Sequence, residues 1–307
     1  METAYPRALP AVDDDLHHSM KPIPLPRLSM LQASRADVAV IFRRGPSKWV
    51  EVIRWDTQRD HFERGAWFNG RIYQRRCDLS PDGELLIYFA SRFTSVDKEY
   101  TYAWTAVSRP PWLTALALWP KGNCWWGGGL FLSKRQIWLN HRPEEALPHP
   151  KHKPRGLRRV EANPEAHGED GPIYYKRLMR DGWDIKQELE IRRQPKRLIS
   201  YETIRPEIRV RGHPKHAFRI IKELRVVDLK AREWFAVEGP SGPVALPPGR
   251  LDWVDWDGHG RLILLVDGMV RVSRVDDHGV AAWTLLLDLR DDKPERRPSP
   301  PEAWKWL

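Results

Sequence analysis

The sequence predicts an all-β protein, and two observations lead to that class. Short apolar runs rich in β-branched and aromatic residues recur along most of the chain, and Gly, Pro or Asp clusters separate them. Few segments show the 3.6-residue period of an amphipathic helix. The chain has 307 residues, of which 41% are hydrophobic, so it is long enough to bury a large core.

Residues 1–34 are predicted to form an N-terminal arm outside the β domain. They contain five prolines, an acidic triplet at 13–15 and little periodic apolar pattern. Lys21–Arg27 alternates proline with other residues, which favours the polyproline II conformation because each proline fixes φ and lacks an N–H group. Such an arm serves as a linker or docks on an aromatic groove.

A β-hairpin is predicted directly after the arm. Residues 38–42 and 48–55 are rich in β-branched and aromatic side chains, and Gly45-Pro46 supplies the turn between them. Further along, Arg219–Arg225 fits either a short helix or a strand, because the segment that follows also suits a strand.

Internal repeats indicate how the strands are organised. Cys77–Tyr88 and Val254–Leu265 align without gaps, with identities at Asp78/Asp255, Gly83/Gly260 and Leu85/Leu262. Fainter similarities are a copy of the first segment at 116–122 and a Gly/Arg/Gly spacing shared by 171–182 and 268–279.

The repeated unit predicts a propeller. Ser80-Pro-Asp-Gly83 fits a type I turn, in which Pro presets φ at the second position and Gly is favoured at the fourth. The run at 85–89 is apolar on both faces, and a sheet of about four strands buries such a run only by stacking against neighbouring sheets. We therefore predict a single β-propeller of about five to six blades over residues 35–307, with an insertion or irregular blade at 142–230.

These two repeats resemble those of TolB-like and WD40-like bacterial β-propellers. The resemblance rests on Ser-Pro-Asp-Gly before an apolar strand at 77–89 and on the Asp-Trp entry, Gly turn and apolar strand at 252–271. It implies a scaffold with a binding surface and transfers no catalytic site. The basic segment 142–230 departs from the repeat rhythm of the family.

The positive charge indicates the kind of partner. The formal net charge is +10, and residues 142–230 hold 22 Lys+Arg against 14 Asp+Glu. Such a concentration attracts an acidic protein or nucleic acid. We predict partner-binding side chains at these basic positions: Arg192, Arg193, Lys196, Arg197, Arg209 and Arg211. A protein partner is the first hypothesis, and a nucleic acid bound along 192–219 is the second.

The chain contains 16 Trp, and most are predicted to wedge between blades. Trp125 and Trp126 differ, because the three glycines after them leave room for an exposed aromatic surface that a partner could contact. Trp304 and Trp306 are expected to pin the end of the chain to the domain.

Signals for catalysis or metal binding are weak. No nucleophile elbow, zinc-protease, P-loop or dinucleotide motif occurs in the sequence. Cys77 and Cys124 are expected to be reduced thiols. The histidines at positions 141, 149, 152 and 167 stand among lysines and arginines that would repel a divalent cation.

We therefore expect a non-catalytic interaction module with no cofactor and no metal. A propeller enzyme or ligand binder with its site at the central channel is a third hypothesis. The N-terminus lacks the apolar run of a signal peptide, and no apolar stretch approaches the roughly 18 residues of a membrane span, so a cytoplasmic location is expected.

Overall fold

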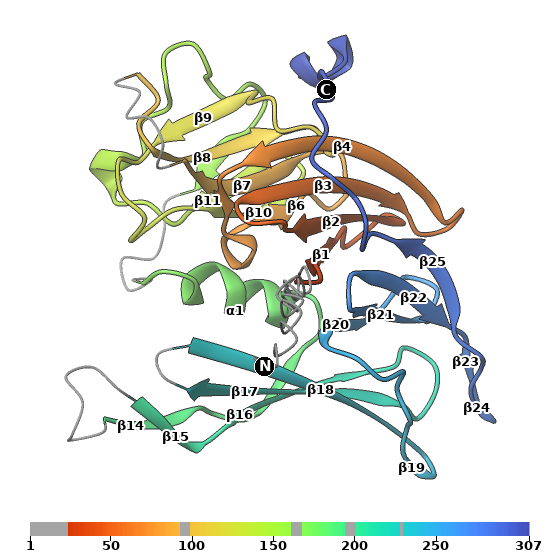
Figure 1. Ribbon diagram of the computed structural model, residues 1–307. Helices are drawn as coiled ribbons and strands as arrows, with labels where there is room; N and C mark the ends of the chain where they lie inside the picture. The colour runs from red at the N-terminus through yellow and green to blue at the C-terminus, as the bar shows by residue number, and fades with distance from the viewer. Residues whose placement is uncertain (1–23, 93–98, 161–167, 194–200, 228–229, 307) are drawn as a thin grey trace, which may run out of the picture.

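Five β-sheets are arranged around a common centre as the blades of a β-propeller (Figure 1). The computed structural model describes residues 24–92, 99–160, 168–193, 201–227 and 230–306. Strands account for 47% of the structure and helices for 8%. The predicted all-β class and propeller architecture are confirmed, with five blades.

Blades 1 and 2 come from the first 120 residues. Blade 1 is an antiparallel sheet in the order β1-β2-β3-β4, and blade 2 is the order β5-β7-β8-β9 with β6 also paired to β7. Their strands are β1 (Arg27–Gln32), β2 (Val38–Arg44), β3 (Trp49–Asp56), β4 (His61–Asn69), β5 (Arg71–Ile72), β6 (Asp78–Leu79), β7 (Leu86–Ser91), β8 (Ala103–Ser108) and β9 (Ala117–Pro120). A 3-10 turn, η1 (Gln74–Arg76), separates β5 from β6.

Blade 3 is small and blade 4 is large. Blade 3 joins β10 (Gly129–Ser133), β11 (Gln136–Leu139) and β12 (Arg158–Val160), with the 3-10 turn η2 (Pro143–Glu145) between the last two. Helix α1 (Gly171–Arg180) leads into the seven-stranded blade 4. Its strands are β13 (Asp184–Gln187), β14 (Glu190–Arg193), β15 (Tyr201–Arg205), β16 (Glu207–Gly212), β17 (Arg219–Val227), β18 (Lys230–Gly239) and β19 (Gly242–Pro243).

Blade 5 brings the chain back to its beginning. It has the order β20-β21-β22-β25 and carries a small hairpin, β23-β24. The strands are β20 (Leu251–Trp256), β21 (Leu262–Val266), β22 (Met269–Ser273), β23 (Val275–Asp276), β24 (Gly279–Val280) and β25 (Thr284–Asp288), and the 3-10 turn η3 (Pro301–Trp304) lies near the C-terminus. Strand β20 contacts β1, so the last blade lies beside the first.

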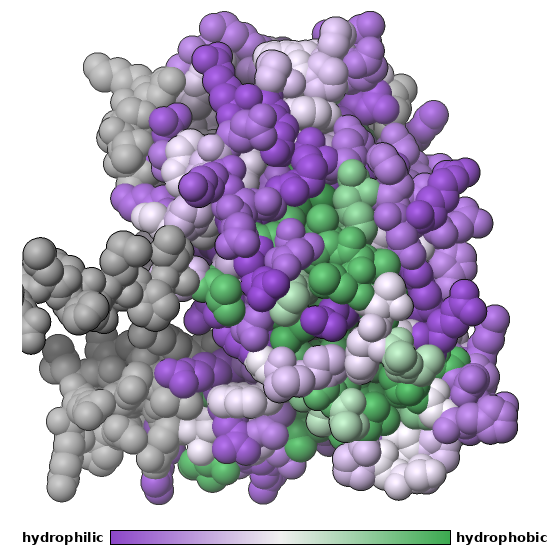
Figure 2. All heavy atoms as spheres, turned by 45° about the vertical axis from the view of Figure 1, so that its right-hand side comes forward, coloured by the Kyte–Doolittle hydropathy of each residue, from purple (hydrophilic) through white to green (hydrophobic). Residues whose placement is uncertain are grey.

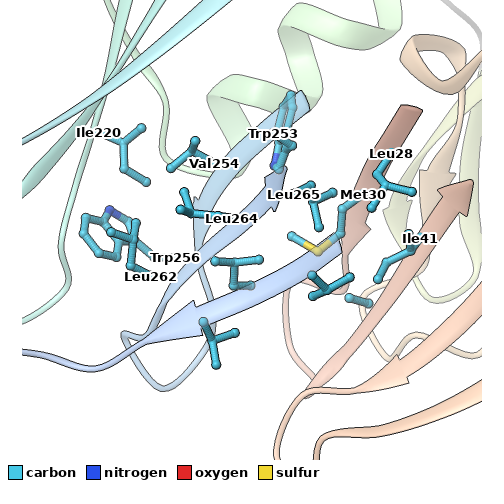
Figure 3. Close-up of a cluster of buried hydrophobic side chains, with 14 of the residues drawn as sticks. Leu28, Met30, Ile41, Ile220, Trp253, Val254, Trp256, Leu262, Leu264 and Leu265 are labelled. Carbon is cyan, nitrogen blue, oxygen red and sulfur yellow. The ribbon is translucent and has the colours of Figure 1, made fainter. Parts of the chain in front are cut away.

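The largest core cluster joins blades 1, 5 and 4. Figure 3 shows the side chains of β20 and β21 between those of β1 and β2 on one side and Ile220 of β17 on the other. The buried residues shown there include Leu28, Met30, Ile41, Val254, Trp256, Leu262, Leu264 and Leu265. Burial of these apolar faces between neighbouring sheets is what the continuous apolar runs of the sequence require.

The two aligned repeats occupy equivalent positions in blades 2 and 5. The N–H of Gly83 donates to the carbonyl of Ser80 at 2.9 Å, and the N–H of Gly260 donates to that of Asp257 at 3.0 Å. Both glycines have positive φ, +76° and +80°, where a side chain would be strained. The first turn joins β6 to β7 and the second joins β20 to β21, so the alignment identified true blade equivalents.

The two aspartates of the repeat have the same role. Asp78 is fully buried and accepts hydrogen bonds from Arg180 at 2.8 and 2.9 Å. Asp255 is also buried and is paired with Arg211. Burial raises the pKa of both carboxyl groups, and the arginines oppose that shift. Each aspartate thus ties its blade to an arginine from α1 or blade 4.

Three expectations are wrong, and one pair of open alternatives is decided in favour of a strand. Residues 27–32 belong to β1 rather than to an arm, because Leu28, Met30 and Leu31 are buried. The fainter copy at 116–122 contains β9, which lies at the edge of the blade that already holds the first repeat. The shared Gly/Arg/Gly spacing covers helix α1 in one case and strand β22 in the other. The helical alternative for 219–225 fails, because the segment lies in β17.

The C-terminal tail crosses blades 1 and 2. Arg43, only 2% exposed, donates to the carbonyls of Leu289 at 2.9 Å and Asp292 at 2.8 Å. Arg297 reaches the buried carboxylate of Glu51 at 2.7 Å. Near the end, Trp306 packs against the core between blades 2 and 3, whereas Trp304 is 65% exposed. Trp306 therefore contributes to holding the tail, whereas Trp304 lies mostly exposed at a cavity that Tyr88 and Trp104 of blade 2 also line.

One face of the molecule carries a hydrophobic patch within a mostly hydrophilic surface. Figure 2, in which the right-hand side of Figure 1 comes forward, shows hydrophobic side chains gathered across its middle and lower right. Blade 5 lies on that side, and its half-buried residues Trp283, Leu286 and Leu287 pack against the largest core cluster. In the ranges that the structure covers, no helix has the length and apolar character needed to cross a membrane.

The hydrogen bonds of Arg43 predict a clear cost of its removal. Replacement Arg43→Gln should lower the free energy of unfolding by about 2–3 kcal/mol, because buried carbonyls of the C-terminal tail lose a charged donor. Urea unfolding followed by circular dichroism measures the change. The neighbour Arg44 provides the matched control, since it makes no such contact with the tail, and equal midpoints for the Arg43→Gln and Arg44→Gln variants would contradict this account.

Candidate functional site

A cavity of about 900 Å³ lies where blades 1, 2, 4 and 5 meet, and arginine dominates its wall. Six arginines and three carboxylates line it. We call it the arginine cavity: Arg27, Arg44, Arg71, Tyr73, Gln74, Arg75, Asp170, Arg232, Glu233, Trp234, Arg250, Leu251 and Asp252. Its volume lies within the range of pockets that bind small molecules or peptide side chains.

Four of the six arginines have no carboxylate partner among the described residues: Arg27, Arg44, Arg71 and Arg232. Three of them lie close together. Arg27 and Arg44 are directly opposite each other in the β1–β2 ladder, so their side chains leave the sheet on the same face. Partial burial, together with the charges of Arg71 and Arg27, lowers the pKa of Arg44.

Arg71 is oriented by an aromatic ring. Its guanidinium lies 4.4 Å from the centroid of the Tyr73 ring, and the guanidinium of Arg76 lies 4.8 Å from the same centroid. Stacking on a ring fixes the plane of a guanidinium while its N–H groups point outward from the edge. The cavity therefore presents donors in a restricted orientation.

All three carboxylates of the wall already have partners. Asp252 accepts from Arg250 at 2.9 Å and from the N–H of Leu28 at 3.0 Å. Asp170 accepts from Arg76 at 2.7 Å. The third carboxylate, Glu233, belongs to a buried network described next. These acids pair with their own partners and, within the described part of the chain, do not pair with Arg27, Arg44, Arg71 or Arg232.

Glu233 joins three parts of the propeller. Arg75 of η1 and the hydroxyl of Tyr174 on α1 each donate to its Oε1 at 2.7 Å, and Lys222 of β17 lies 3.1 Å from the same oxygen. Although burial acts against ionisation, Lys222 and Arg75 hold the pKa of Glu233 below its usual value. The network thus fixes the wall of the arginine cavity to blades 2 and 4 and to α1.

Lys222 is enclosed by aromatic rings. Its Nζ lies 4.5 Å from the ring centroid of Tyr174 and 4.6 Å from that of Trp253, with Trp183 and Phe235 within 5.9 Å. Such rings stabilise a cation by their quadrupoles. Burial nevertheless lowers the pKa of Lys222 to about 8, although Glu233 opposes the shift.

A second cavity, of about 450 Å³, lies beside the predicted tryptophans. Trp125 is 69% exposed, and the guanidinium of Arg142 stacks on Trp126 at 5.2 Å. Glu145 and Glu169 also line this cavity. Arg76 connects it to the arginine cavity, because it is paired with Glu169 of one wall and with Asp170 of the other, at 2.8 and 2.7 Å. Trp125 is therefore exposed to solvent, as the sequence predicted.

The basic positions predicted from the sequence do not form one surface in the part of the chain that the structure describes. Arg192 lies exposed on β14, where Arg193 follows it, and Lys196 and Arg197 fall outside the described residues. Arg209 is 4% exposed and paired with Glu207 at 2.6 Å, so it does not lie on the open surface. Arg211 is paired with the buried Asp255.

The histidine cluster has structural roles. His141 is buried between the hydroxyl of Thr105 and the carbonyl of Glu145, and burial lowers its pKa to about 4. His149 is also buried, and the Nδ1 of His152 is 2.9 Å from the carbonyl of Ala115. His167 lies outside the described residues. Within the described ranges, no three His, Cys, Asp or Glu side chains form a group that could hold a metal ion.

Sequence reasoning missed the arginine cavity because its residues are spread over the chain. They come from β1, β2, residues 71–75, the residue before α1, β18 and residues 250–252, and the arginines among them stand singly or in pairs along the sequence. One part of the cavity could have been predicted from the sequence. If β1 and β2 are paired as a hairpin, their register places Arg27 opposite Arg44.

In comparisons with known proteins, neither a protein-family model nor a curated protein matches this chain.

The buried amine of Lys222 predicts a pH dependence of stability. The pKa of Lys222 is lowered to about 8 in the folded state and is about 10.4 in the unfolded state. Between these two pH values, the unfolded chain therefore binds more protons than the folded protein does. Stability should therefore rise from pH 8 to pH 10 relative to that of the Lys222→Met variant, by about 2 kcal/mol.

Urea unfolding at pH 8, 9 and 10 measures this difference. The exposed Lys186, which is paired with Asp184, supplies a control in which Lys186→Met leaves the pH profile of the wild type unchanged. Parallel profiles for the wild type and Lys222→Met would contradict the assignment.

The crowding of like charges predicts that a cavity arginine opposes folding. Arg44→Gln should raise the free energy of unfolding by about 0.5 kcal/mol at low salt, because it removes repulsion from Arg27 and Arg71. The gain should shrink in about 0.5 M salt, where charges are screened over a few ångströms. A loss of more than about 1 kcal/mol would show that Arg44 is a structural residue.

Proposed function

We propose that the protein is a non-catalytic β-propeller interaction module that binds an acidic segment of a protein partner in the arginine cavity. The observation that carries this proposal is the set of four cavity arginines that have no carboxylate partner within the described residues. Grouping like charges costs stability unless an anion compensates them. A concave site at the junction of four blades fits a projecting segment of a partner.

The exposed Trp125 supports the same role. An aromatic side chain with most of its surface open to solvent, next to a second cavity, is a common anchor in protein interfaces. Since Arg76 links the walls of both cavities, an extended segment that fills one lies near the other. We propose that Trp125 and Trp126 contact residues that flank the acidic segment.

We also propose that the chain is a TolB-like or WD40-like propeller that acts in the cytoplasm as a scaffold. The equivalent Asp and Gly positions of blades 2 and 5 support the first part. Two free cysteines, of which Cys77 is buried, are compatible with a reducing compartment. The partner-binding role of Arg192 and its basic neighbours stays a prediction.

Binding of a fluorescent peptide of about ten glutamates tests the proposal. Fluorescence anisotropy should show saturable binding that weakens roughly tenfold or more in the double variant Arg44→Glu/Arg71→Glu, because two attractive charges become repulsive. Arg59→Glu/Arg219→Glu is the matched control, since both of these exposed arginines pair with acids outside the cavity.

Two outcomes would contradict the proposal. Equal affinity for the wild type and the cavity variant would place the acidic ligand elsewhere. Tighter binding of a single-stranded RNA of similar charge, with a steep salt dependence that the cavity variant abolishes, would assign the site to nucleic acid instead.

A further inference from the structure

The arrangement of the free guanidinium groups indicates which anion the arginine cavity recognises. We propose that it binds a phosphoryl group, so that the acidic segment of the partner is phosphorylated. This inference rests on the proposed function and specifies the ligand of the same cavity.

The first argument is charge density. Arg27 and Arg44 face each other on adjacent strands, and Arg71 is close enough to influence Arg44. A single carboxylate brings one negative charge to these three cations. A phosphorylated side chain brings about −1.5 to −2 at neutral pH and compensates most of the excess with one group.

The second argument is the geometry of the donors. A guanidinium donates two parallel hydrogen bonds to a carboxylate or a phosphate, and three guanidinium groups therefore offer more donors than one carboxylate can accept. A phosphoryl group has three acceptor oxygens, so Arg27, Arg44 and Arg71 can bind it together. Because Arg71 stacks on Tyr73, the orientation of its guanidinium is already restricted before a ligand binds.

The third argument concerns the identity of the cations. Among the residues that the structure describes, no lysine lines the arginine cavity, and the cations without a carboxylate partner are all arginines. The nearby Lys222 is turned into the aromatic cage and toward Glu233, so it takes no part in the wall. Arginine is preferred where planar, bidentate recognition of an oxyanion is required.

The size of the cavity favours a group carried on a peptide over a free ion. About 900 Å³ exceeds the volume of one phosphate several-fold, and the wall also offers Tyr73, Leu251 and Trp234, which is 45% exposed, to neighbouring groups. A phosphorylated side chain places its phosphate at the arginines while the adjoining backbone fills the remaining space.

The test compares two pentapeptides that differ only in phosphorylation: a serine, or a phosphoserine, with two glutamates on each side. Isothermal titration calorimetry should show that the phosphopeptide binds the full-length protein roughly tenfold or more tightly than the serine peptide. The variant Arg27→Gln/Arg44→Gln/Arg71→Gln should lose this difference. Arg59→Gln/Arg135→Gln/Arg219→Gln is the control with the same change in charge outside the cavity.

Folding of the triple cavity variant is verified by its urea midpoint, which should equal or exceed that of the wild type. Inorganic phosphate and tripolyphosphate are titrated in parallel, as is citrate, which carries a similar charge on carboxylates. Phosphate should compete with the phosphopeptide, and citrate should do so at least several-fold more weakly.

The outcomes separate this inference from the proposed function. Equal affinity for the two pentapeptides, with binding that still requires the cavity arginines, would overturn phosphoryl recognition and leave an acidic segment as the ligand. Binding of tripolyphosphate without binding of either peptide would overturn the protein ligand altogether. Phosphopeptide binding that survives in the triple cavity variant would also overturn the inference.

Discussion

The largely buried carboxylate of Glu233, whose side chain is 14% exposed at the cavity wall, is the interaction on which the arrangement of this propeller depends most directly. Arg75 reaches it from blade 2, Tyr174 from the helix before blade 4, and Lys222 from blade 4 itself. A buried carboxylate without such partners would be costly, and a buried lysine without Glu233 would be costly as well. The ionic network therefore fixes elements that apolar packing alone would leave free to shift.

The same network accounts for the charge of the arginine cavity. Glu233 and Asp170 accept from Arg75 and Arg76 of blade 2, and Asp252 accepts from its neighbour Arg250 and from the N–H of Leu28 in blade 1. None of the three pairs with Arg27, Arg44 or Arg71. Among the described residues, the three carboxylates of the wall thus serve the structure, and Arg27, Arg44 and Arg71 face the cavity without a carboxylate partner. Such a division is expected where a site is prepared for an anion that comes from outside.

The sequence predicted the propeller because its strongest signals were local. The Ser80–Gly83 turn and its counterpart at 257–260 need only neighbouring residues to be interpreted, and both occupy equivalent places in two blades. The sequence pattern did not predict helix α1, because two of its buried side chains, Tyr174 and Arg177, carry polar atoms and weaken the apolar periodicity. Arg177 is buried because it donates to backbone carbonyls of blade 2.

The site was harder to predict than the fold for a related reason. The basic run around 192–197 was predicted to bind a partner because its charges are adjacent in the sequence. The arginines of the cavity, which lie on four strands, on η1 and just before β20, come together only after these elements have packed. Linear charge density could not show this, whereas the exposed Trp125 could be anticipated because the glycines that follow it are its neighbours in sequence.

The most direct test of the central claim, that the arginine cavity is the ligand site, is hydrogen exchange measured with and without a saturating glutamate peptide. We expect added protection at backbone amides of 42–45, 71–76 and 250–252, the segments that contain lining residues of the cavity. Protection confined to 190–193 and 201–212, the basic strands of blade 4, would contradict the account and return the site to the basic segment that the sequence suggested.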